Sequence, residues 1–274
     1  MMTINCNKKL IDISSPKVMG ILNVTPDSFF DGGKYKNETD ILLQVEKMLS
    51  EGATFIDVGA YSSRPGATHI SEEVELQRIV PIVELLVQNF PEIIISADTF
   101  RSNVAQKTIE AGAAMINDIS GGKIDAYMFE TVAKLQVPYI LMHMLGTPQN
   151  MQESPNYEDI TKEVISFFAK QLFKLHQLKV NDVLIDVGFG FGKTIEHNYE
   201  LLKNLSLFKN LDAPILVGIS RKSMLYKPLK ITTQLALNAT TSANTIALLN
   251  GANILRVHDV KEAMEAIKIV EQLS

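Results

Sequence analysis

Residues 93–118, IIISADTFRSNVAQKTIEAGAAMIND, contain the pattern that decides the fold of this chain. One apolar run ends just before Asp98, a segment with helical periodicity follows, and a second apolar run ends just before Asn117. A parallel strand covered on both faces is continuously apolar, whereas a covering helix repeats its apolar residues every three or four positions. The stretch therefore predicts two parallel strands joined by a helix.

The same unit recurs eight times along the chain. Strands that alternate with helices predict parallel pairing through right-handed crossovers. Eight units in 274 residues favour an α/β fold of the closed (β/α)8 TIM-barrel type over a doubly wound open sheet. The predicted strands are residues 18–22, 55–58, 93–96, 114–116, 139–142, 183–185, 215–217 and 254–257. The predicted helices are residues 39–50, 72–89 (with a kink or a late start at Pro81), 103–111, 126–135, 157–178, 199–205, 234–249 and 260–272.

No linker, low-complexity tract or charge block interrupts this pattern. We therefore expect a single domain over residues 1–274, with residues 1–15 as a short N-terminal cap at the bottom of the barrel. The connections after the first, second and fifth strands are long: residues 23–38, 59–71 and 144–156. Loops of this length are usually functional lids or disordered, and all three would lie on one barrel face.

The composition excludes some classes of function. The chain has 26 Lys and Arg against 31 Asp and Glu, and this net charge of −5 argues against general nucleic-acid binding. Its only cysteine, Cys6, permits no internal disulfide, which fits a reducing compartment. Residues 1–10 lack the apolar core of a signal peptide, and no stretch is long enough to span a membrane. We expect a soluble cytoplasmic protein with neither nucleic-acid nor membrane partners.

Polar residues end three of the middle strands: Asp98, Asn117 and Asp186. In a parallel barrel, the carboxyl ends of the strands form the active-site face. Two carboxylates and an amide present mostly hydrogen-bond acceptors, which suits a flat heterocycle with amino and ring N–H groups, such as a pterin. The two carboxylates would equally serve as an acid–base pair or a metal site. Asp118 competes with Asn117 for the inward direction, because side chains alternate along a strand.

Cationic residues gather in the last two units. The segment GISRKS (218–223) follows the seventh strand, and Arg256 and His258 lie two positions apart on the eighth, so they point to one face. Barrels often bind phosphate between these two loops, so we expect an anion site. Lys222, within GISRKS, is alternatively a Schiff-base lysine.

Three further loop features bear on binding. Asn23 ends the first strand, and its amide oxygen is either a ligand for Mg²⁺ or part of a turn. The segment GAYSSRPG (59–66) offers hydroxyls and an arginine fork for phosphate, although alone it is more typical of a surface loop. The segment GFGFGKT (188–194) lacks the spacing of a P-loop or a dinucleotide-binding loop, so we expect it to bend around a ligand and present Phe191.

Together these motifs resemble the dihydropteroate synthase family, over essentially the whole chain from residue 18. The likeness rests on MGILNVTPDSF (19–29), SRPG (63–66), SRKS (220–223) and RVH (256–258). It implies a transferase of folate biosynthesis that joins 6-hydroxymethyl-7,8-dihydropterin diphosphate to 4-aminobenzoate, with release of pyrophosphate. It also implies Mg²⁺ as cofactor and a homodimer.

The resemblance also assigns roles to single residues. It implies a pterin site of Asp98, Asn117, Met142, Asp186 and Lys222; a pyrophosphate site of Asn23, Ser63, Arg256 and His258, with Asn23 as the Mg²⁺ ligand; an aminobenzoate site of Arg64, Pro65, Phe191 and Ser223; and catalytic roles for Asn23, Asp98, Lys222 and Arg256. The alternatives are a pterin-dependent methyltransferase, a catalytically silent pterin-binding protein and a Schiff-base aldolase.

Overall fold

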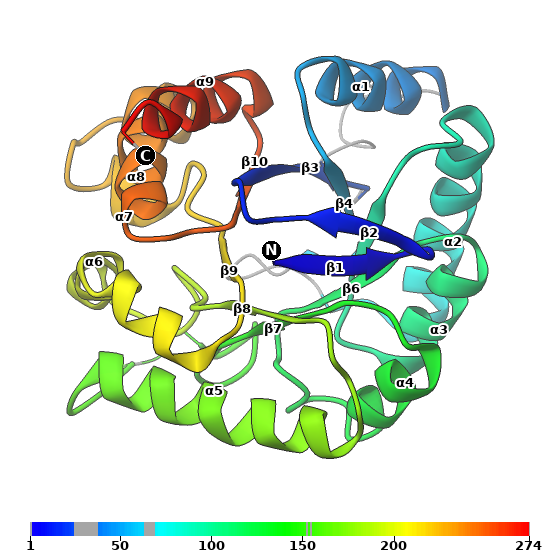
Figure 1. The fold of residues 1–274 in the computed structure, drawn as a ribbon, viewed down its shortest axis with the longest axis horizontal. Helices are drawn as coiled ribbons and strands as arrows, with labels where there is room; N and C mark the ends of the chain where they lie inside the picture. Colours follow the sequence, from blue (N-terminus) through cyan, green and yellow to red (C-terminus); the bar gives the residue numbers. More distant parts are fainter. Residues whose placement is uncertain (1, 25–37, 63–68, 152, 154, 274) are drawn as a thin grey trace.

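In the computed structural model, eight parallel strands close into a barrel surrounded by helices (Figure 1). The structure describes residues 2–24, 38–62, 69–151, 153 and 155–273. The strands pair in the order β10-β3-β4-β5-β6-β7-β8-β9, and β9 pairs with β10 to close the ring. The predicted barrel is thus confirmed, and the open-sheet alternative is wrong. The barrel strands are β3 (Lys17–Asn23), β4 (Phe55–Gly59), β5 (Ile95–Asp98), β6 (Met115–Asp118), β7 (Tyr139–Met142), β8 (Val183–Asp186), β9 (Ile215–Val217) and β10 (Ile254–Val257).

Most helices begin and end within three residues of the predicted positions, and the short helix α7 was not predicted. Helix α2 begins at Glu72, where the Ser71 hydroxyl accepts the N–H of Val74 at 3.3 Å, and it continues through Pro81, so the late start is wrong. Helix α6 begins at Ile195 rather than residue 199, because Thr194 and His197 form a capping box. The helices are α1 (Glu38–Ser50), α2 (Glu72–Asn89), α3 (Ser102–Glu110), α4 (Met128–Leu135), α5 (Ile160–Gln177), α6 (Ile195–Lys203), α7 (Ser223–Tyr226), α8 (Leu237–Leu249) and α9 (Val260–Glu271), with 3₁₀ turns at Leu205–Leu211 and Thr233–Leu235.

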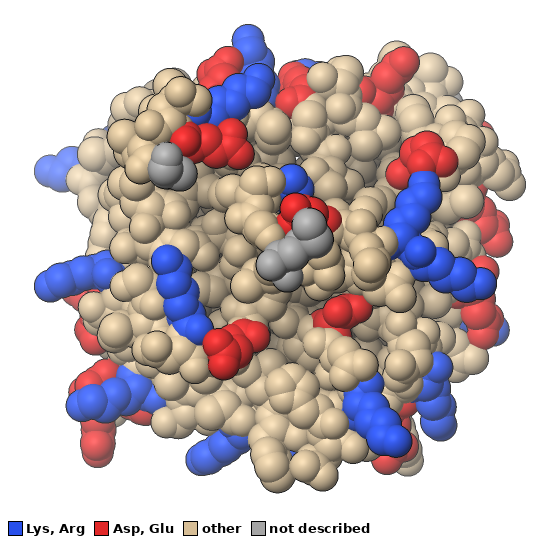
Figure 2. Space-filling model, in the orientation of Figure 1, with Lys and Arg blue, Asp and Glu red and all other residues tan. Residues whose placement is uncertain are grey.

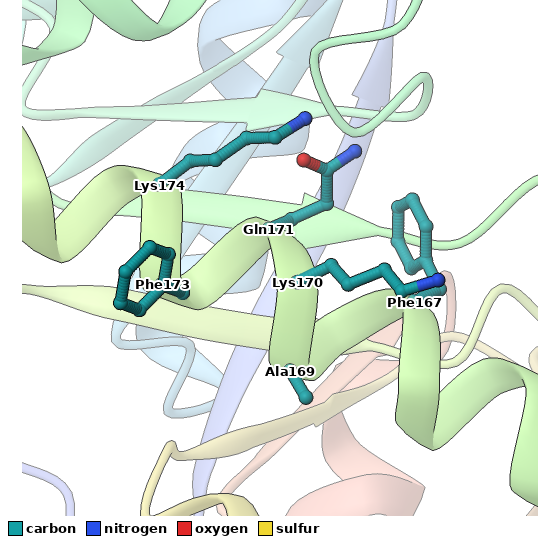
Figure 3. Close-up of a pocket in the computed structure, with 6 residues that line it drawn as sticks. All are labelled: Phe167, Ala169, Lys170, Gln171, Phe173 and Lys174. Atoms are coloured by element: carbon teal, nitrogen blue, oxygen red, sulfur yellow. The ribbon is translucent and has the colours of Figure 1, made fainter.

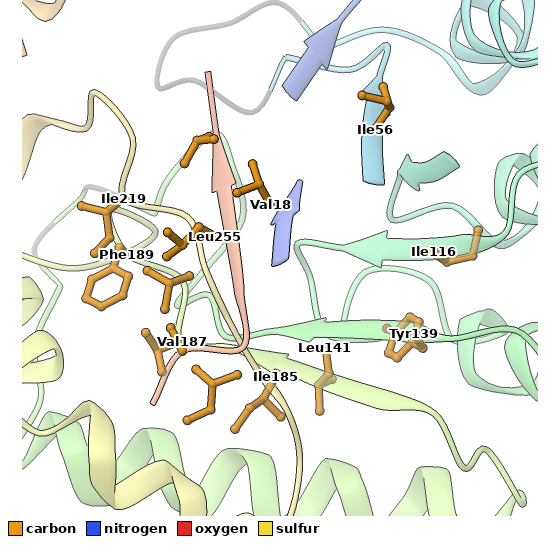
Figure 4. Close-up of a cluster of buried hydrophobic side chains, with 14 of the residues drawn as sticks. Val18, Ile56, Ile116, Tyr139, Leu141, Ile185, Val187, Phe189, Ile219 and Leu255 are labelled. Carbon is orange, nitrogen blue, oxygen red and sulfur yellow. The ribbon is translucent and has the colours of Figure 1, made fainter. Parts of the chain in front are cut away.

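Alternate residues of the barrel strands form two apolar layers. One set of side chains, including Val18, Ile56 and Leu141, belongs to the large cluster shared with the surrounding helices (Figure 4). The intervening residues, such as Phe55 and Ile140, form a separate cluster inside the barrel. Burial on both faces explains why these strands are continuously apolar in sequence.

A short hairpin covers the end of the barrel at which the strands begin (Figure 1). Strands β1 (Thr3–Cys6) and β2 (Lys9–Asp12) pair antiparallel, and Ile4, Cys6 and Ile13 pack against the interior apolar cluster. The N–H of Asn5 donates to the Asp182 carboxylate, just before β8, at 2.9 Å. The opposite end, where the strands finish, is the end at which barrel enzymes build their sites.

The surface adds two observations. On the face seen in Figure 2, acidic and basic side chains are interspersed, and no extended basic patch covers it. Among the helices of the described residues, none is both long and apolar enough to cross a bilayer.

Candidate active site

The barrel interior changes from apolar to polar within one pleat. Residues two apart on a strand point to the same side, so each interior apolar residue predicts the direction of the residue two positions later. Those later residues include Asp57, Asn117, Met142, Asp186 and Arg256, which follow Phe55, Met115, Ile140, Leu184 and Ile254 in the interior cluster. The strand sequences therefore build a polar layer directly above an apolar floor.

Arg256 is the centre of this polar layer. Its Nε donates to Asp57 Oδ2 at 2.6 Å, and its Nη2 donates to Asp98 Oδ2 at 2.8 Å. Asn117 Nδ2 donates to the same Asp57 oxygen at 3.1 Å. Four strands, β4, β5, β6 and β10, are thus joined through one guanidinium and its partners.

The charges in this cluster alter each other's protonation. Burial and then the neighbouring Asp57 carboxylate raise the pKa of Asp98 to about 7, although Arg256 opposes them. Burial alone would lower the pKa of the Arg256 guanidinium. The carboxylates of Asp57 and Asp98 have the larger combined effect, so the pKa is raised. The side chains of Arg256 and Asp98 remain 18% and 16% exposed, so a ligand can reach them, whereas Asp57 is fully buried.

A second group lies around Asp186 at the end of β8. Asp186 Oδ1 accepts the N–H of Gly188 at 2.8 Å. Burial raises the pKa of Asp186, against the effect of the Lys222 ammonium. Burial also lowers the pKa of Lys222 to about 8, against the effect of Asp186. Lys222 donates to the Phe189 carbonyl, and its Nζ lies 4.7 Å from the centroid of the Phe191 ring.

The loop that carries Phe191 has a shape that requires glycine at residue 188. Gly188 has a φ of +69°, and a Cβ there would lie 2.0 Å from the His143 carbonyl oxygen. The buried Lys193 holds the other end of the loop, because its Nζ donates to the Phe191 carbonyl at 2.9 Å and lies 3.0 Å from His143 Nδ1. Burial lowers the pKa of His143 to about 2, so this imidazole is neutral. The prediction that the segment bends and presents Phe191 agrees with this geometry.

Two of the cationic residues predicted in the last two units, His258 and Arg221, have different partners. The Ser220 hydroxyl and His258 Nδ1 lie 2.9 Å apart, and the His258 N–H donates to the same hydroxyl at 3.2 Å. Arg221 instead forms a two-point pair with Asp259, at 2.8 and 2.7 Å, and donates to two loop carbonyls. Arg221 is thus held by Asp259, whereas His258, the residue immediately after β10, lies beside Ser220.

The other predicted site residues are placed as follows. Asn23 ends β3 beside Gly59, and Ser223 begins α7, immediately after Lys222. Met142 packs with Phe191 in an apolar cluster around the mouth, which also contains Tyr61, Phe100, Ile119, Met144 and Met151. Ser63, Arg64 and Pro65 lie outside the described residues.

Two buried residues in this region were not predicted from the sequence. Asp57 lies inside an apolar run rather than at its end, although its position two after Phe55 has the same phase as Asn117 after Met115. Lys193 is only 3% exposed, yet a lysine in a glycine-rich loop is ordinarily solvated. The position of Asp57, two residues after the interior Phe55, marks it in the sequence, whereas no local signal marks Lys193. The competition between neighbours on β6 is settled, because Asp118 instead accepts the Tyr139 hydroxyl at 2.6 Å.

A hollow of about 660 Å³ lies along helix α5, on the outside of the barrel (Figure 3). It contains none of the polar-layer residues. Its lining residues are Phe167, Ala169, Lys170, Gln171, Phe173 and Lys174. The polar mouth of the barrel, with its acceptors and cations, is therefore the candidate site.

Known proteins are similar to this chain over most of its length. Residues 19–258 match the family described as pterin binding enzyme. The dihydropteroate synthase of Escherichia coli (strain K12) is 44% identical over 263 residues, which cover 95% of this chain and 93% of that protein.

Solved structures give the same result. The Yersinia pestis dihydropteroate synthase with a sulfonamide drug complex is similar with a TM-score of 0.93 and 44% identity, covering 99% of both chains. The Xanthomonas albilineans dihydropteroate synthase in complex with 7,8-dihydropteroate has a TM-score of 0.89 and 32% identity, covering 99% of this chain and 98% of that one.

Proposed function

Because this chain belongs to the dihydropteroate synthase family of pterin-binding enzymes, we propose that it joins 6-hydroxymethyl-7,8-dihydropterin diphosphate to 4-aminobenzoate. The products are 7,8-dihydropteroate and pyrophosphate. The observation that carries the proposal is the joint presence of acceptors (Asp98, Asn117, Asp186) and cations (Lys222, Arg256) in one barrel mouth.

The acceptors fit the donor-rich edge of a pterin. An ionised carboxylate only accepts hydrogen bonds, so Asp57 requires the NH₂ of Asn117, and the amide oxygen of Asn117 is left to face a ligand. With Asp98 and Asp186, this oxygen forms a set of acceptors for the amino and ring N–H groups. Lys222 supplies a donor for a ring carbonyl, and the apolar cluster around Met142 covers the face of the ring.

The cations fit the leaving group. The bond between the pterin methylene carbon and the diphosphate oxygen breaks, and its electron pair leaves with the pyrophosphate. Arg256 and His258, with Ser63, would hold the phosphate oxygens as negative charge develops on them, which is the usual way in which such sites stabilise a transition state. The arylamine nitrogen then bonds to the methylene carbon and loses a proton, and it needs no strong base because it is neutral at pH 7.

Mg²⁺ fits the donor set at Asn23. Magnesium prefers oxygen ligands and keeps several waters, so a single amide oxygen and the substrate's phosphate oxygens form a suitable set. Within the described residues there is no group of three or more His, Cys, Asp or Glu side chains that would make a complete protein metal site. When bound, the ion would neutralise charge on the diphosphate.

The aminobenzoate would bind beside the pterin, against Phe191 and Ser223. Both residues adjoin Lys222, Phe191 through its ring and Ser223 through the chain. Arg64 and Pro65 would complete this pocket from the connection after β4. The nucleophile would thus approach the methylene carbon from the side on which the glycine-rich loop is anchored.

The decisive experiment combines purified protein, Mg²⁺, the pterin diphosphate and 4-aminobenzoate. We expect dihydropteroate and pyrophosphate in equal amounts, and no dihydropteroate when 4-aminobenzoate is omitted. In EDTA, calorimetry should show loss of tight binding of the pterin diphosphate. Absence of product with all components present would contradict the proposed reaction, and unchanged affinity in EDTA would contradict the role of Asn23.

We also propose a cytoplasmic homodimer. Large apolar side chains are exposed on the last two helices, with Ile246 and Leu249 of α8 at 46% and 56% and Ile269 of α9 at 67%. Exposed apolar side chains that adjoin one another are typical of surfaces that another chain covers, and helices α8 and α9 are neighbours. Sedimentation of the purified chain tests this, and a monomer at micromolar concentration would contradict it.

The cytoplasmic location is supported by a single cysteine, Cys6, which leaves no internal disulfide to form.

A further inference from the structure

Asp57 is the most buried charged group of the barrel mouth. Its side chain is 0% exposed, whereas those of Arg256 and Asp98 are 18% and 16% exposed. A buried carboxylate is costly unless it is paired and hydrogen-bonded. One of its oxygens, Oδ2, accepts hydrogen bonds from Arg256 Nε and from Asn117 Nδ2. The other oxygen, Oδ1, has no hydrogen-bond partner among the described residues.

The neighbour of Asp57 on β5 does not complete its hydrogen bonding. Ser96 is in register with Asp57, and its hydroxyl oxygen is also buried without a hydrogen-bond partner among the described residues. A carboxylate kept only for stability would be expected to use both oxygens, since unsatisfied buried polar groups are rare. Asp57 is therefore a buried carboxylate with one unpaired oxygen, and all of its hydrogen bonds are to two residues of the candidate site, Arg256 and Asn117.

The two contacts fix different features of those residues. The bond to Nε orients the plane of the Arg256 guanidinium, so that Nη2 reaches Asp98 on the far side of β4. The bond from Asn117 Nδ2 determines which way its amide faces, because a carboxylate cannot donate. Without Asp57, the guanidinium would lose one of its two anchors and the amide would be free to turn over.

We propose that Asp57 is a positioning residue, which orients Arg256 and Asn117 toward the pterin diphosphate without touching it. This inference rests on the proposed function. Its effect should be confined to the pterin diphosphate, because neither contact of Asp57 reaches the Phe191 side of the mouth, where 4-aminobenzoate would bind.

The test compares Asp57→Ala, Asp57→Asn and the wild-type chain in steady-state kinetics with each substrate varied. For Asp57→Ala we expect kcat/KM for the pterin diphosphate to fall about 10- to 100-fold, since small misplacements of binding groups have effects of this size. The KM for 4-aminobenzoate should stay within about twofold of the wild-type value, because its pocket keeps its own supports. Asp57→Asn retains an acceptor for both donors, so it should recover part of the loss.

A pH profile gives a second readout, which reports the electrostatic effect of the Asp57 carboxylate on Asp98. The groups that act on the pKa of Asp98 are Asp57, Arg256, Glu75 and Asp118, with Lys222 close by. Removal of the Asp57 charge lowers the pKa of Asp98, so the acid limb of kcat/KM for the pterin diphosphate should move to lower pH in Asp57→Asn.

The matched control is Ser96→Ala, which removes a buried hydroxyl beside Asp57 that forms no hydrogen bond with Arg256 or Asn117. It should leave both KM values and the acid limb unchanged. Thermal unfolding of every variant separates loss of fold from loss of positioning. Equal loss for both substrates together with a large fall in Tm would overturn the inference, as would wild-type kinetics in Asp57→Ala. If the wild-type chain neither binds the pterin diphosphate nor makes product, the proposed function fails and the inference fails with it.

Discussion

Two ionisable side chains in the barrel mouth have pKa values displaced toward neutrality from opposite directions. Burial raises the pKa of Asp98 to about 7 and lowers that of Lys222 to about 8. If the pterin site needs an ionised Asp98 and a protonated Lys222, both conditions hold together only in the interval between these values. The apparent values belong to the whole cluster, because its charges interact strongly.

We therefore predict a narrow, bell-shaped pH profile of kcat/KM for the pterin diphosphate. Activity rises as pH increases through about 7, where Asp98 loses its proton, and falls above about 8, where Lys222 loses its own. Lys222→Ala should lower turnover at least about tenfold through loss of a charged hydrogen bond. Lys222→Arg should abolish the alkaline limb, because a guanidinium does not deprotonate in this range. The exposed Lys227→Arg is the control, and an alkaline limb that survives in Lys222→Arg would assign it to another group.

At the residue scale, the sequence predicts the ends of strands better than their interiors. Asp98, Asn117 and Asp186 are visible because a polar residue interrupts an apolar run just where the strand ends. Asp57 is hidden inside such a run, and its pairing with Arg256 joins residues 199 positions apart. Distant pairs of this kind depend on barrel closure, which no local pattern specifies.

At the scale of elements, the glycine-rich loop after β8 depends on one buried lysine. Lys193 Nζ lies 3.2 Å from the His143 carbonyl as well as 2.9 Å from the Phe191 carbonyl, so it ties the loop to the end of β7. Burial holds the pKa of Lys193 well below its usual range. The loop is thus held by hydrogen bonds whose donor is kept out of water.

Lys193→Met should separate the position of this loop from the stability of the fold. Methionine retains the length of the side chain but has no donor, so Phe191 should lose its anchor and the KM for 4-aminobenzoate should rise by roughly tenfold. The Tm should stay the same or increase, because an apolar residue of similar size removes the cost of burying an amine. Lys203→Met, at an exposed position of α6, is the control. A fall in Tm with an unchanged KM for 4-aminobenzoate would show that Lys193 serves the fold alone.

Element boundaries were predictable where apolar pattern and capping agree. Strands β7 and β9 have the predicted bounds because each is an uninterrupted apolar run that follows a proline, and β10 has them although it contains Arg256. Strand β5 begins at Ile95 rather than at residue 93, because the apolar run starts before pairing with β4 begins. The start of α6 was misplaced because Thr194 and His197 form a capping box in which histidine replaces the usual acidic residue or its amide.

At the scale of the whole molecule, the barrel followed from counting units, since eight strand–helix repeats leave few ways to bury every apolar face. The hairpin was harder to specify, because each of its strands has only four residues and β2 has no alternation of buried and exposed positions. Because the hairpin lies across the barrel floor, it can contribute to the stability of the fold without contacting the candidate site. The hairpin contacts the apolar floor, whereas the polar layer lies on the other side of that floor.

This separation predicts that the hairpin stabilises the fold without affecting the reaction. Ile4 is 1% exposed and packs with the interior cluster, so Ile4→Ala should lower the free energy of unfolding by about 2–5 kcal/mol, the usual result of removing such a side chain from a core. Urea denaturation measures this loss, and Leu10→Ala, at a position 72% exposed in the same hairpin, should change the midpoint little. Activity per folded molecule should be that of the wild type in both variants, because the contacts of Arg256, Asp98 and Lys222 do not pass through the hairpin. A selective change in KM for either substrate in Ile4→Ala would show instead that the floor transmits its packing to the polar layer above it.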